Sequence, residues 1–139
     1  MPIKPELRRW YPWDWSELSR SIRFRRAGGR CEGCGRQHGS EVPTFPGGAW
    51  FDGDLGIWRD DRGRRTALPR QPQVARTTRV VLATAHLNHD PADNRPRNLR
   101  ALCGRCHLAH DRDEHRRRRW ITYRARRAIG DLFLGQYRT

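Results

Sequence analysis

The apolar positions of this chain fall into short groups that are separated by long polar stretches. The first fifteen residues carry Trp10, Trp13 and Trp15 among prolines, which predicts an extended segment whose aromatic rings fold over the rest of the chain. Ser16 is then a candidate N-cap of a helix that ends at Ala27, because two glycines follow that residue.

The middle of the chain predicts strands. Residues 36–75 are rich in glycine, proline and charge, and their two short aromatic groups predict hairpins with turns at Gly53 and at 61–63. The run 77–87 is rich in β-branched and aliphatic residues and predicts one strand that delivers His86 near its end.

The last third of the chain predicts helices. Asn98 stands where an N-cap is expected, so a helix is predicted from this residue through His107. A last helix is predicted to begin near Asp113, because apolar residues recur at helical spacing after it and arginines cover the remaining positions. Helices and strands together predict an α+β fold, and 139 residues are the length of one domain.

Cysteine spacing adds a metal site to this picture. The four cysteines form two Cys-x-x-Cys pairs, Cys31 with Cys34 and Cys103 with Cys106, each with a glycine inside. Two such pairs supply the four thiolates of a closed tetrahedral zinc site. Disulfides are the alternative, but the tight glycine turns favour a structural Zn²⁺, which would help a chain with a small core to fold.

The charge of the chain points to a polyanionic partner. Lysine and arginine outnumber the acidic residues by 29 to 15, giving a formal net charge of +14. Nearly all the basic residues are arginines, whose planar guanidinium suits phosphate, so nucleic acid is the expected partner. A basic surface that binds nothing is the alternative. No stretch has the length or apolarity of a signal core or membrane span, which predicts a cytoplasmic protein without a membrane partner.

Histidine, asparagine and aspartate gather close to the second cysteine pair. In chain order the group comprises His86, Asn88, His89, Asp90, Asn98 and His107. Side chains of these types hold divalent cations and transfer protons near neutral pH. The group therefore predicts a catalytic metal site beside the structural one.

The segment that contains this group resembles the HNH endonuclease family, whose ββα-metal core cuts DNA. The resemblance rests on Ala85-His86-Leu87, Asn98-Leu99 and Leu102-Cys103-x-x-Cys106-His107. It covers about residues 28–111 apart from an insert near 40–75, and it implies one nuclease domain over 1–139. That domain is a small ββα-metal core with a four-cysteine zinc site, flanked by an aromatic-rich lead-in and helix over 1–27 and a basic helix over 112–139.

The resemblance also implies roles for individual residues. His86 is the general base that activates water, and His107 is a ligand of a catalytic divalent ion, Mg²⁺, Mn²⁺ or Ni²⁺, separate from the zinc. Asn98 braces the loop by hydrogen bonds, so that the base faces the scissile phosphate. His110 and His115 are expected to be solvated helix residues.

One position departs from the family pattern. The family usually places Asp or His immediately before the base, and this chain has Ala85 there. Either Asn88, His89 or Asp90 reaches the metal from the loop, or the register shifts, so that Asn88 and His89 act as the usual Asp-His pair. His86 is favoured as the base because its spacing to the motif asparagine fits better, and His89 is the alternative.

The sequence thus predicts a metal-dependent endonuclease that nicks or cleaves DNA, most readily duplex DNA, and needs no small-molecule substrate. Its expected phosphate contacts are Arg112, Arg116, Arg117, Arg118 and Arg119. The alternative function is a zinc-stabilised nucleic-acid-binding module that has lost catalysis, for which Ala85 is the support. A zinc adaptor for a protein partner explains neither the arginines nor the histidines.

Overall fold

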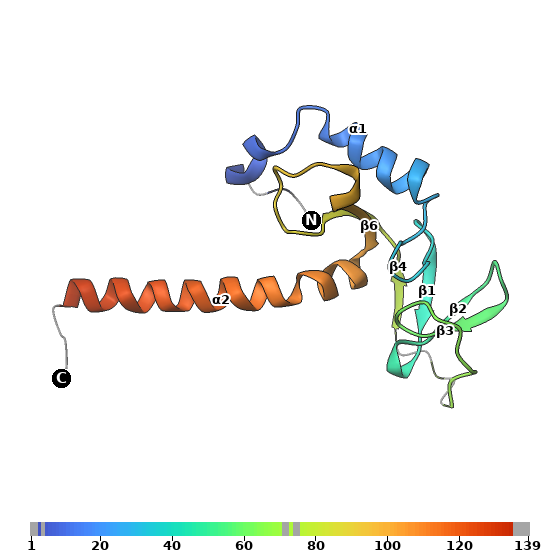
Figure 1. Cartoon of the computed structure of the whole chain (residues 1–139). Helices are drawn as coiled ribbons and strands as arrows, with labels where there is room; N and C mark the ends of the chain where they lie inside the picture. The colour runs from blue at the N-terminus through green and yellow to red at the C-terminus, as the bar shows by residue number, and fades with distance from the viewer. Residues whose placement is uncertain (1–2, 4, 71–72, 74–75, 135–139) are drawn as a thin grey trace.

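The computed structural model describes residues 3, 5–70, 73 and 76–134, and it combines two antiparallel sheets with an N-terminal helical segment and one long C-terminal helix (Figure 1). After a 3-10 helix at Pro5–Trp10, helix α1 spans Trp15–Arg20 and continues as a π-helical segment at Ser21–Arg26. Helix α2 spans Gly104–Leu134. The predicted α+β class is confirmed.

The first sheet is built from residues 41–79 and has four strands in the order β3-β2-β1-β4. The strands are β1 at Glu41–Thr44, β2 at Trp50–Asp52, β3 at Ile57–Arg59 and β4 at Arg76–Arg79. The predicted turn at Gly53 joins β2 to β3, and the predicted turn at 61–63 follows β3. Trp50 anchors the sheet, because its ring is buried and its Nε1 donates a hydrogen bond of 3.0 Å to the Asp60 carbonyl.

The second sheet is a hairpin of β5, Leu82–His86, and β6, Leu99–Cys103. On one face of the hairpin, Leu99 and Ala101 are buried against Ile22 of the N-terminal helical segment. On the other face, Ala85 and Leu102 pack with the two cysteine pairs, which meet next to the start of α2. The hairpin therefore separates the N-terminal helical segment from α2.

The expected helix from Asn98 is a wrong prediction, because residues 99–103 form strand β6. The buried side chains of this segment are divided between the two packed faces of the hairpin, and Leu99 lies opposite His86 in the antiparallel pairing. The helix starts only at Gly104, and Asn98 is the last residue of a short 3-10 turn. Ser16 is likewise not the N-cap, since α1 starts at Trp15, preceded by Asp14.

The single strand predicted over 77–87 is also wrong. The chain switches from one sheet to the other at Val80 and Val81, so that β4 pairs with β1 and β5 pairs with β6. The backbone N–H of Val80 donates to the Ser40 carbonyl at 2.8 Å, whereas Val81 is exposed. An exposed strand rich in threonine, a two-residue switch and a buried strand follow one another without a turn residue, so the sequence has the β-branched and aliphatic pattern of one long strand, which explains the error.

The last helix does not begin near Asp113, because α2 runs without a break from Gly104. No glycine or proline interrupts residues 105–129, so nothing in the backbone ends the helix between His107 and Asp113. The second half of α2 projects away from the rest of the protein (Figure 1).

Candidate functional site

The four cysteines come together at the junction of three elements. Cys31 and Cys34 lie in the turn after the N-terminal helical segment, Cys103 ends β6, and Cys106 lies in the first turn of α2. Their four sulfur atoms all lie within 4.8 Å of one another, and the Sγ atoms of Cys34 and Cys103 are 3.7 Å apart. Sulfurs at about 2.3 Å from a tetrahedral Zn²⁺ are about 3.8 Å apart. The donor set and its geometry therefore fit structural zinc.

Two groups outside the cluster donate hydrogen bonds to its sulfur atoms. The backbone N–H of Cys103 and the guanidinium of Arg36 donate hydrogen bonds of 3.2 Å to Cys31 Sγ and Cys34 Sγ, respectively. Hydrogen bonds among the thiols divide the cluster: chiefly the one with Cys103 lowers the pKa of Cys31, and chiefly the one with Cys106 lowers the pKa of Cys103 to about 6, whereas hydrogen bonds with Cys103 raise the pKa values of Cys34 and Cys106. Gly33 keeps the knuckle compact, since a Cβ there would lie 3.0 Å from Cys106 Sγ.

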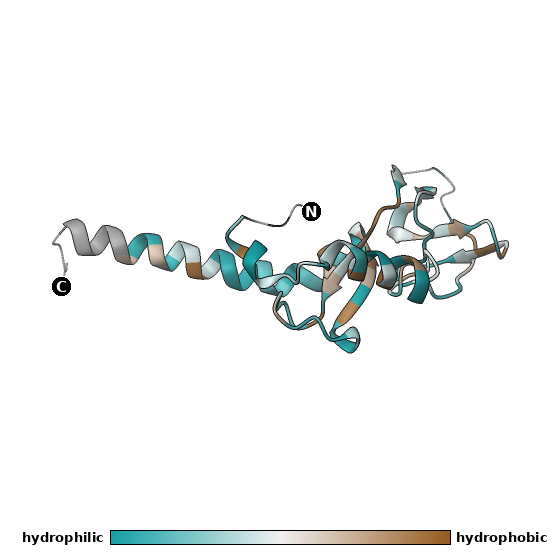
Figure 2. Cartoon of the chain, turned by 90° about the horizontal axis from the view of Figure 1, so that it is seen from above, coloured by the Kyte–Doolittle hydropathy of each residue, from teal (hydrophilic) through white to brown (hydrophobic). Residues whose placement is uncertain are grey.

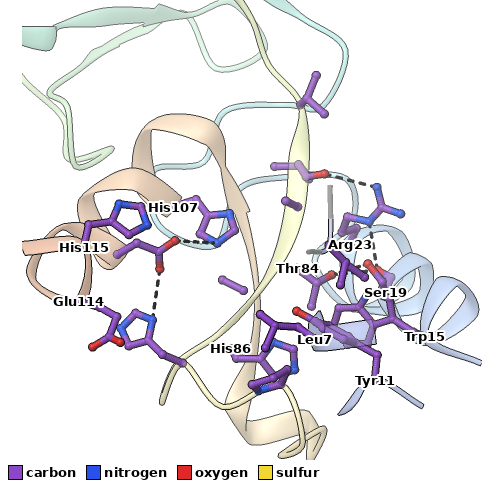
Figure 3. Close-up of a pocket in the computed structure, with 18 of the residues that line it drawn as sticks. Leu7, Tyr11, Trp15, Ser19, Arg23, Thr84, His86, His107, Glu114 and His115 are labelled. Carbon is purple, nitrogen blue, oxygen red and sulfur yellow. Dashed lines mark hydrogen bonds and ion pairs between the residues drawn. The ribbon is translucent and has the colours of Figure 1, made fainter. Parts of the chain in front are cut away.

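His86 lies on the face of the hairpin that the N-terminal helical segment covers. Its ring stacks on Trp15 with the ring centroids 5.1 Å apart, and Tyr11 meets it edge-on. Its Nε2 shares a hydrogen bond of 3.0 Å with Asn94 Oδ1. Figure 3 shows His86 grouped with Trp15 and Tyr11, while His107 lies across the strand from them.

His89 lies on the opposite side, next to α2. It is the one non-glycine residue in the described part of the chain with a positive φ, 60°. Its imidazole lies next to the helix, where Nδ1 is 3.4 Å from Asp111 Oδ1. The ring also stacks on that of His110, with the centroids 4.6 Å apart. Such a backbone conformation is uncommon for residues other than glycine, although histidine adopts it more often than most, and it concentrates at functional sites.

Asp111 joins His89 to His107. It is one helical turn after His107, and its Oδ2 lies 3.3 Å from His107 Nε2, while its Oδ1 faces His89. The Asp111 side chain is largely buried. Burial lowers the pKa of His107, and the carboxylate of Asp111 opposes that shift. A lowered pKa keeps the imidazole neutral near physiological pH, which is the form that coordinates a metal.

A cleft of about 840 Å³ connects these groups (Figure 3). It passes around the edge of β5, with the N-terminal aromatic residues on one wall and α2 on the other. Both His86 and His89 line it, as do His107 and Asp111. At its outer end Arg118 and Arg119 line the same wall of α2, so the cleft becomes basic with distance from the histidines.

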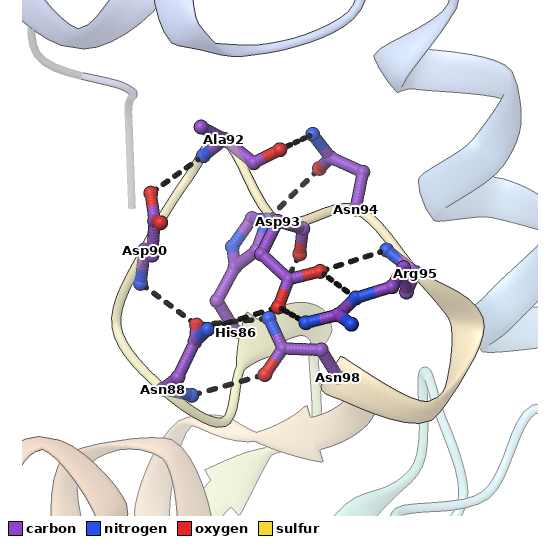
Figure 4. Close-up of polar contacts among 8 residues, drawn as sticks. All are labelled: His86, Asn88, Asp90, Ala92, Asp93, Asn94, Arg95 and Asn98. Carbon is purple, nitrogen blue, oxygen red and sulfur yellow. Dashed lines mark hydrogen bonds and ion pairs between the residues drawn. The ribbon is translucent and has the colours of Figure 1, made fainter.

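The loop between the two hairpin strands is held by a network around Asn98 (Figure 4). The buried Asn98 side chain donates hydrogen bonds of 2.8 Å to Asn88 Oδ1 and to the Asp93 carbonyl, and it accepts one of 3.1 Å from the Asn88 backbone N–H. Arg95 donates two hydrogen bonds to the Asp93 carboxylate and lowers the pKa of Asp93 to about 2. These contacts fix the backbone that carries His89.

The other loop candidates do not join the group around Asp111. Asn88 Oδ1 accepts hydrogen bonds from Asn98 and from the Asp90 backbone, so Asn88 belongs to the loop network. Asp90 is exposed and accepts a hydrogen bond from the Ala92 backbone. Ala85 faces the core at 2% exposure, so the position expected to hold a metal ligand is enclosed by apolar side chains.

The arginines expected to bind nucleic acid are exposed on α2 but do not share one face. Arg118 and Arg119 line the cleft, whereas Arg116 lies on the far side of the helix, because successive residues turn by about 100°. Arg112 precedes Arg119 by seven residues and lies at the border between these two faces. Several of them also pair along the helix with acidic neighbours; the Arg118 Nε, for example, lies 2.7 Å from Glu114 Oε1.

Sequence reasoning missed two residues of this group. Asp111 was not singled out, and His110 was expected to be solvated, yet its Nε2 lies 3.3 Å from the His86 carbonyl and its ring packs on His89. The signal for Asp111 was its spacing, since a carboxylate four residues after His107 shares that face of a helix. The signal was hidden because the helix was predicted to break between them.

In the part of the chain that the structure describes, no helix combines the length and apolarity needed to cross a membrane. Comparison of the chain with protein-family models, with curated proteins and with solved structures finds no match.

Proposed function

We propose that this chain is a metal-dependent endonuclease of the HNH type, which hydrolyses phosphodiester bonds of DNA. The observation that carries the proposal is the convergence of His89 and His107 on the two oxygens of Asp111, inside a cleft that continues between arginines. The order of the elements supports it, because a strand, a braced loop, a second strand and a helix are what a ββα-metal core requires.

The geometry supports His89 rather than His86 as the general base. With its Nδ1 turned to Asp111, His89 keeps the tautomer in which Nε2 accepts the proton of an attacking water. His86 is occupied by Trp15 and Asn94 on the other side of the strand. In this assignment His86 holds the loop in place through Asn94, and Asp111 of α2, rather than residue 85 or Asn88, supplies the acidic ligand.

His107 Nε2 and Asp111 Oδ2 are the proposed protein ligands of the catalytic cation. Their separation of 3.3 Å is close to the 3.0 Å or so between neighbouring ligands of an octahedral ion at about 2.1 Å. A cation held by these two side chains would supply stabilisation of the charge that develops on the leaving oxygen. Asp111 thereby serves both groups, with one oxygen orienting the base and the other facing the cation.

The arginines Arg118 and Arg119 extend the wall of the cleft, and we propose that they hold the phosphates next to the one that is cut. A module that only binds DNA needs neither the His89–Asp111 contact nor a left-handed histidine. The binding module is therefore the second candidate function, and it becomes the conclusion if the protein binds DNA but never cuts it.

The test is incubation of the purified, zinc-loaded protein with supercoiled plasmid and Mg²⁺, Mn²⁺ or Ni²⁺. Relaxed circles or linear DNA are expected with at least one ion from the wild type and not from His89→Ala. If the wild type retards the plasmid in a gel and leaves it supercoiled with all three ions, the nuclease proposal is overturned and the binding module takes its place.

A further inference from the structure

The far side of the projecting half of α2 carries a stripe of arginine and aromatic residues that the proposed nuclease site does not use. With about 100° per residue, this stripe lies opposite the side that carries His107 and Asp111. Its members, called here the outer face, are Arg116, just before this half, and Trp120, Tyr123 and Arg127 within it. The part of the projecting half that Figure 2 colours is mostly hydrophilic with isolated apolar positions.

The two aromatic rings of the outer face stay largely exposed in the folded protein. Trp120 and Tyr123 are each 58% exposed on a helix that has left the rest of the protein. Arginines hold them in place: the Arg124 guanidinium lies 4.7 Å from the Trp120 ring centre, and Arg127 donates a hydrogen bond of 2.8 Å to the Tyr123 hydroxyl. Two exposed rings three residues apart share one face of the helix, so together they offer adjacent stacking surfaces to a partner.

Charge identifies the partner. The outer face and its neighbours carry arginines at nearly every second position, so a second copy of the same helix would be repelled. A polyanion is attracted. Aromatic rings interleaved with arginines bind unpaired bases by stacking while the guanidinium groups contact phosphates. Bases inside a duplex are stacked on one another and do not present their faces to such rings.

We propose that the outer face of α2 binds single-stranded nucleic acid. Trp120 and Tyr123 stack on successive unpaired bases, and Arg116 and Arg127 contact the phosphates on either side. Trp120 is about 14 Å along the helix from Asp111, a distance of a few nucleotides. Single-stranded DNA would thus be held close to the cleavage cleft. That placement rests on the proposed nuclease function, whereas the binding itself does not.

The test measures fluorescence anisotropy of labelled oligothymidylate of about 20 nucleotides, and of a duplex of equal length, without added divalent ions so that no cleavage occurs. The double variant Trp120→Ala/Tyr123→Ala is expected to bind oligothymidylate about tenfold more weakly or worse and to bind the duplex within about twofold of the wild type. Trp120→Phe keeps a ring and is expected to retain most of the binding. Phe51→Ala, which removes an exposed ring from β2, is the matched control and should change neither affinity.

Two results would overturn the proposal. One is unchanged binding of oligothymidylate by the double variant. The other is an equal loss for single strand and duplex, which would make the outer face a duplex contact. The substituted rings are exposed, so melting curves of wild type and variants are expected to coincide. Plasmid cleavage by the double variant is measured separately, so a failure of the nuclease proposal is seen independently of this result.

Discussion

The Nδ1 atom of His89 lies 3.4 Å from Oδ1 of Asp111, and this contact joins the loop after β5 to the helix after β6. His89 lies three residues after the end of β5, in a turn where it adopts a left-handed backbone conformation. The contact therefore defines which histidine of the loop faces α2.

His89→Ala is expected to reduce cleavage by about 100-fold or more, the usual contribution of a general base, while DNA binding and zinc content stay unchanged. Rates of plasmid nicking with saturating Mn²⁺ measure the effect. His86→Ala is the matched comparison: it is expected to retain cleavage but to lower the melting temperature, because it removes the Trp15 stack and the Asn94 hydrogen bond. The opposite pattern would restore the assignment made from motif spacing.

Replacement of Cys103 by Ser is expected to remove zinc and to destabilise the whole fold, because metal-binding free energy at a structural site is also folding free energy. Metal analysis and thermal unfolding measure the two effects. Gly104→Ala next to it, where a Cβ meets no atom within 4 Å, is the control and should keep the metal. A stable Cys103→Ser protein with no zinc in the wild type would contradict the assignment.

Asn98→Ala is expected to loosen the loop, because the Asn88 backbone N–H and the Asp93 carbonyl lose their partner at a buried position. Each orphaned group costs about 1–3 kcal/mol. The expected result is a lower free energy of unfolding in urea together with a large fall in cleavage rate. Asn94→Ala, in the same loop, leaves the Asn98 contacts in place and should reduce cleavage much less.

Gly63→Ala tests how the four-stranded sheet is attached to the zinc knuckle. Gly63 has a φ of 82°, and a Cβ there would lie 2.3 Å from the Cys34 carbonyl oxygen. The substitution is expected to lower the free energy of unfolding by more than about 1 kcal/mol, because both the backbone and the contact are strained. Gly53→Ala sits in a turn of the same sheet with no atom within 4 Å of the added Cβ, so it should be nearly neutral.

The lowered pKa of His107 predicts a pH dependence of folding. Below the ordinary value of 6.5 the unfolded chain takes up a proton on this imidazole before the folded chain does, so stability falls as the pH drops below that value. Above it both states are neutral and the residue contributes no slope. Urea unfolding of the protein without added divalent ions is measured between about pH 5.5 and 7.5. The free energy of unfolding is expected to fall less with decreasing pH in His107→Gln than in the wild type. Equal slopes would contradict the burial effect.

The sequence was informative where chemistry depends on local spacing. The cysteine pairs, the early hairpins and Asn98 at the loop could be identified because their signals lie within a few residues. The errors arose where packing on both sides overrides local pattern: Leu99 to Leu102 has apolar residues that suit a helix, but they are divided between two faces of a hairpin. The choice between His86 and His89 depended on one positive φ, which single-sequence patterns do not specify.

The start of α2 at the cysteine cluster has a mechanical consequence. A helix of 31 residues is about 46 Å long, and it is held at one end, where Cys106 lies in its first turn. A rotation of about 5° at that anchor would move the distal end by about 4 Å while moving His107 by only a fraction of an ångström. Small changes in metal coordination that reorient the first turn of the helix would therefore cause large displacements of the arginines that are farthest from the cysteines.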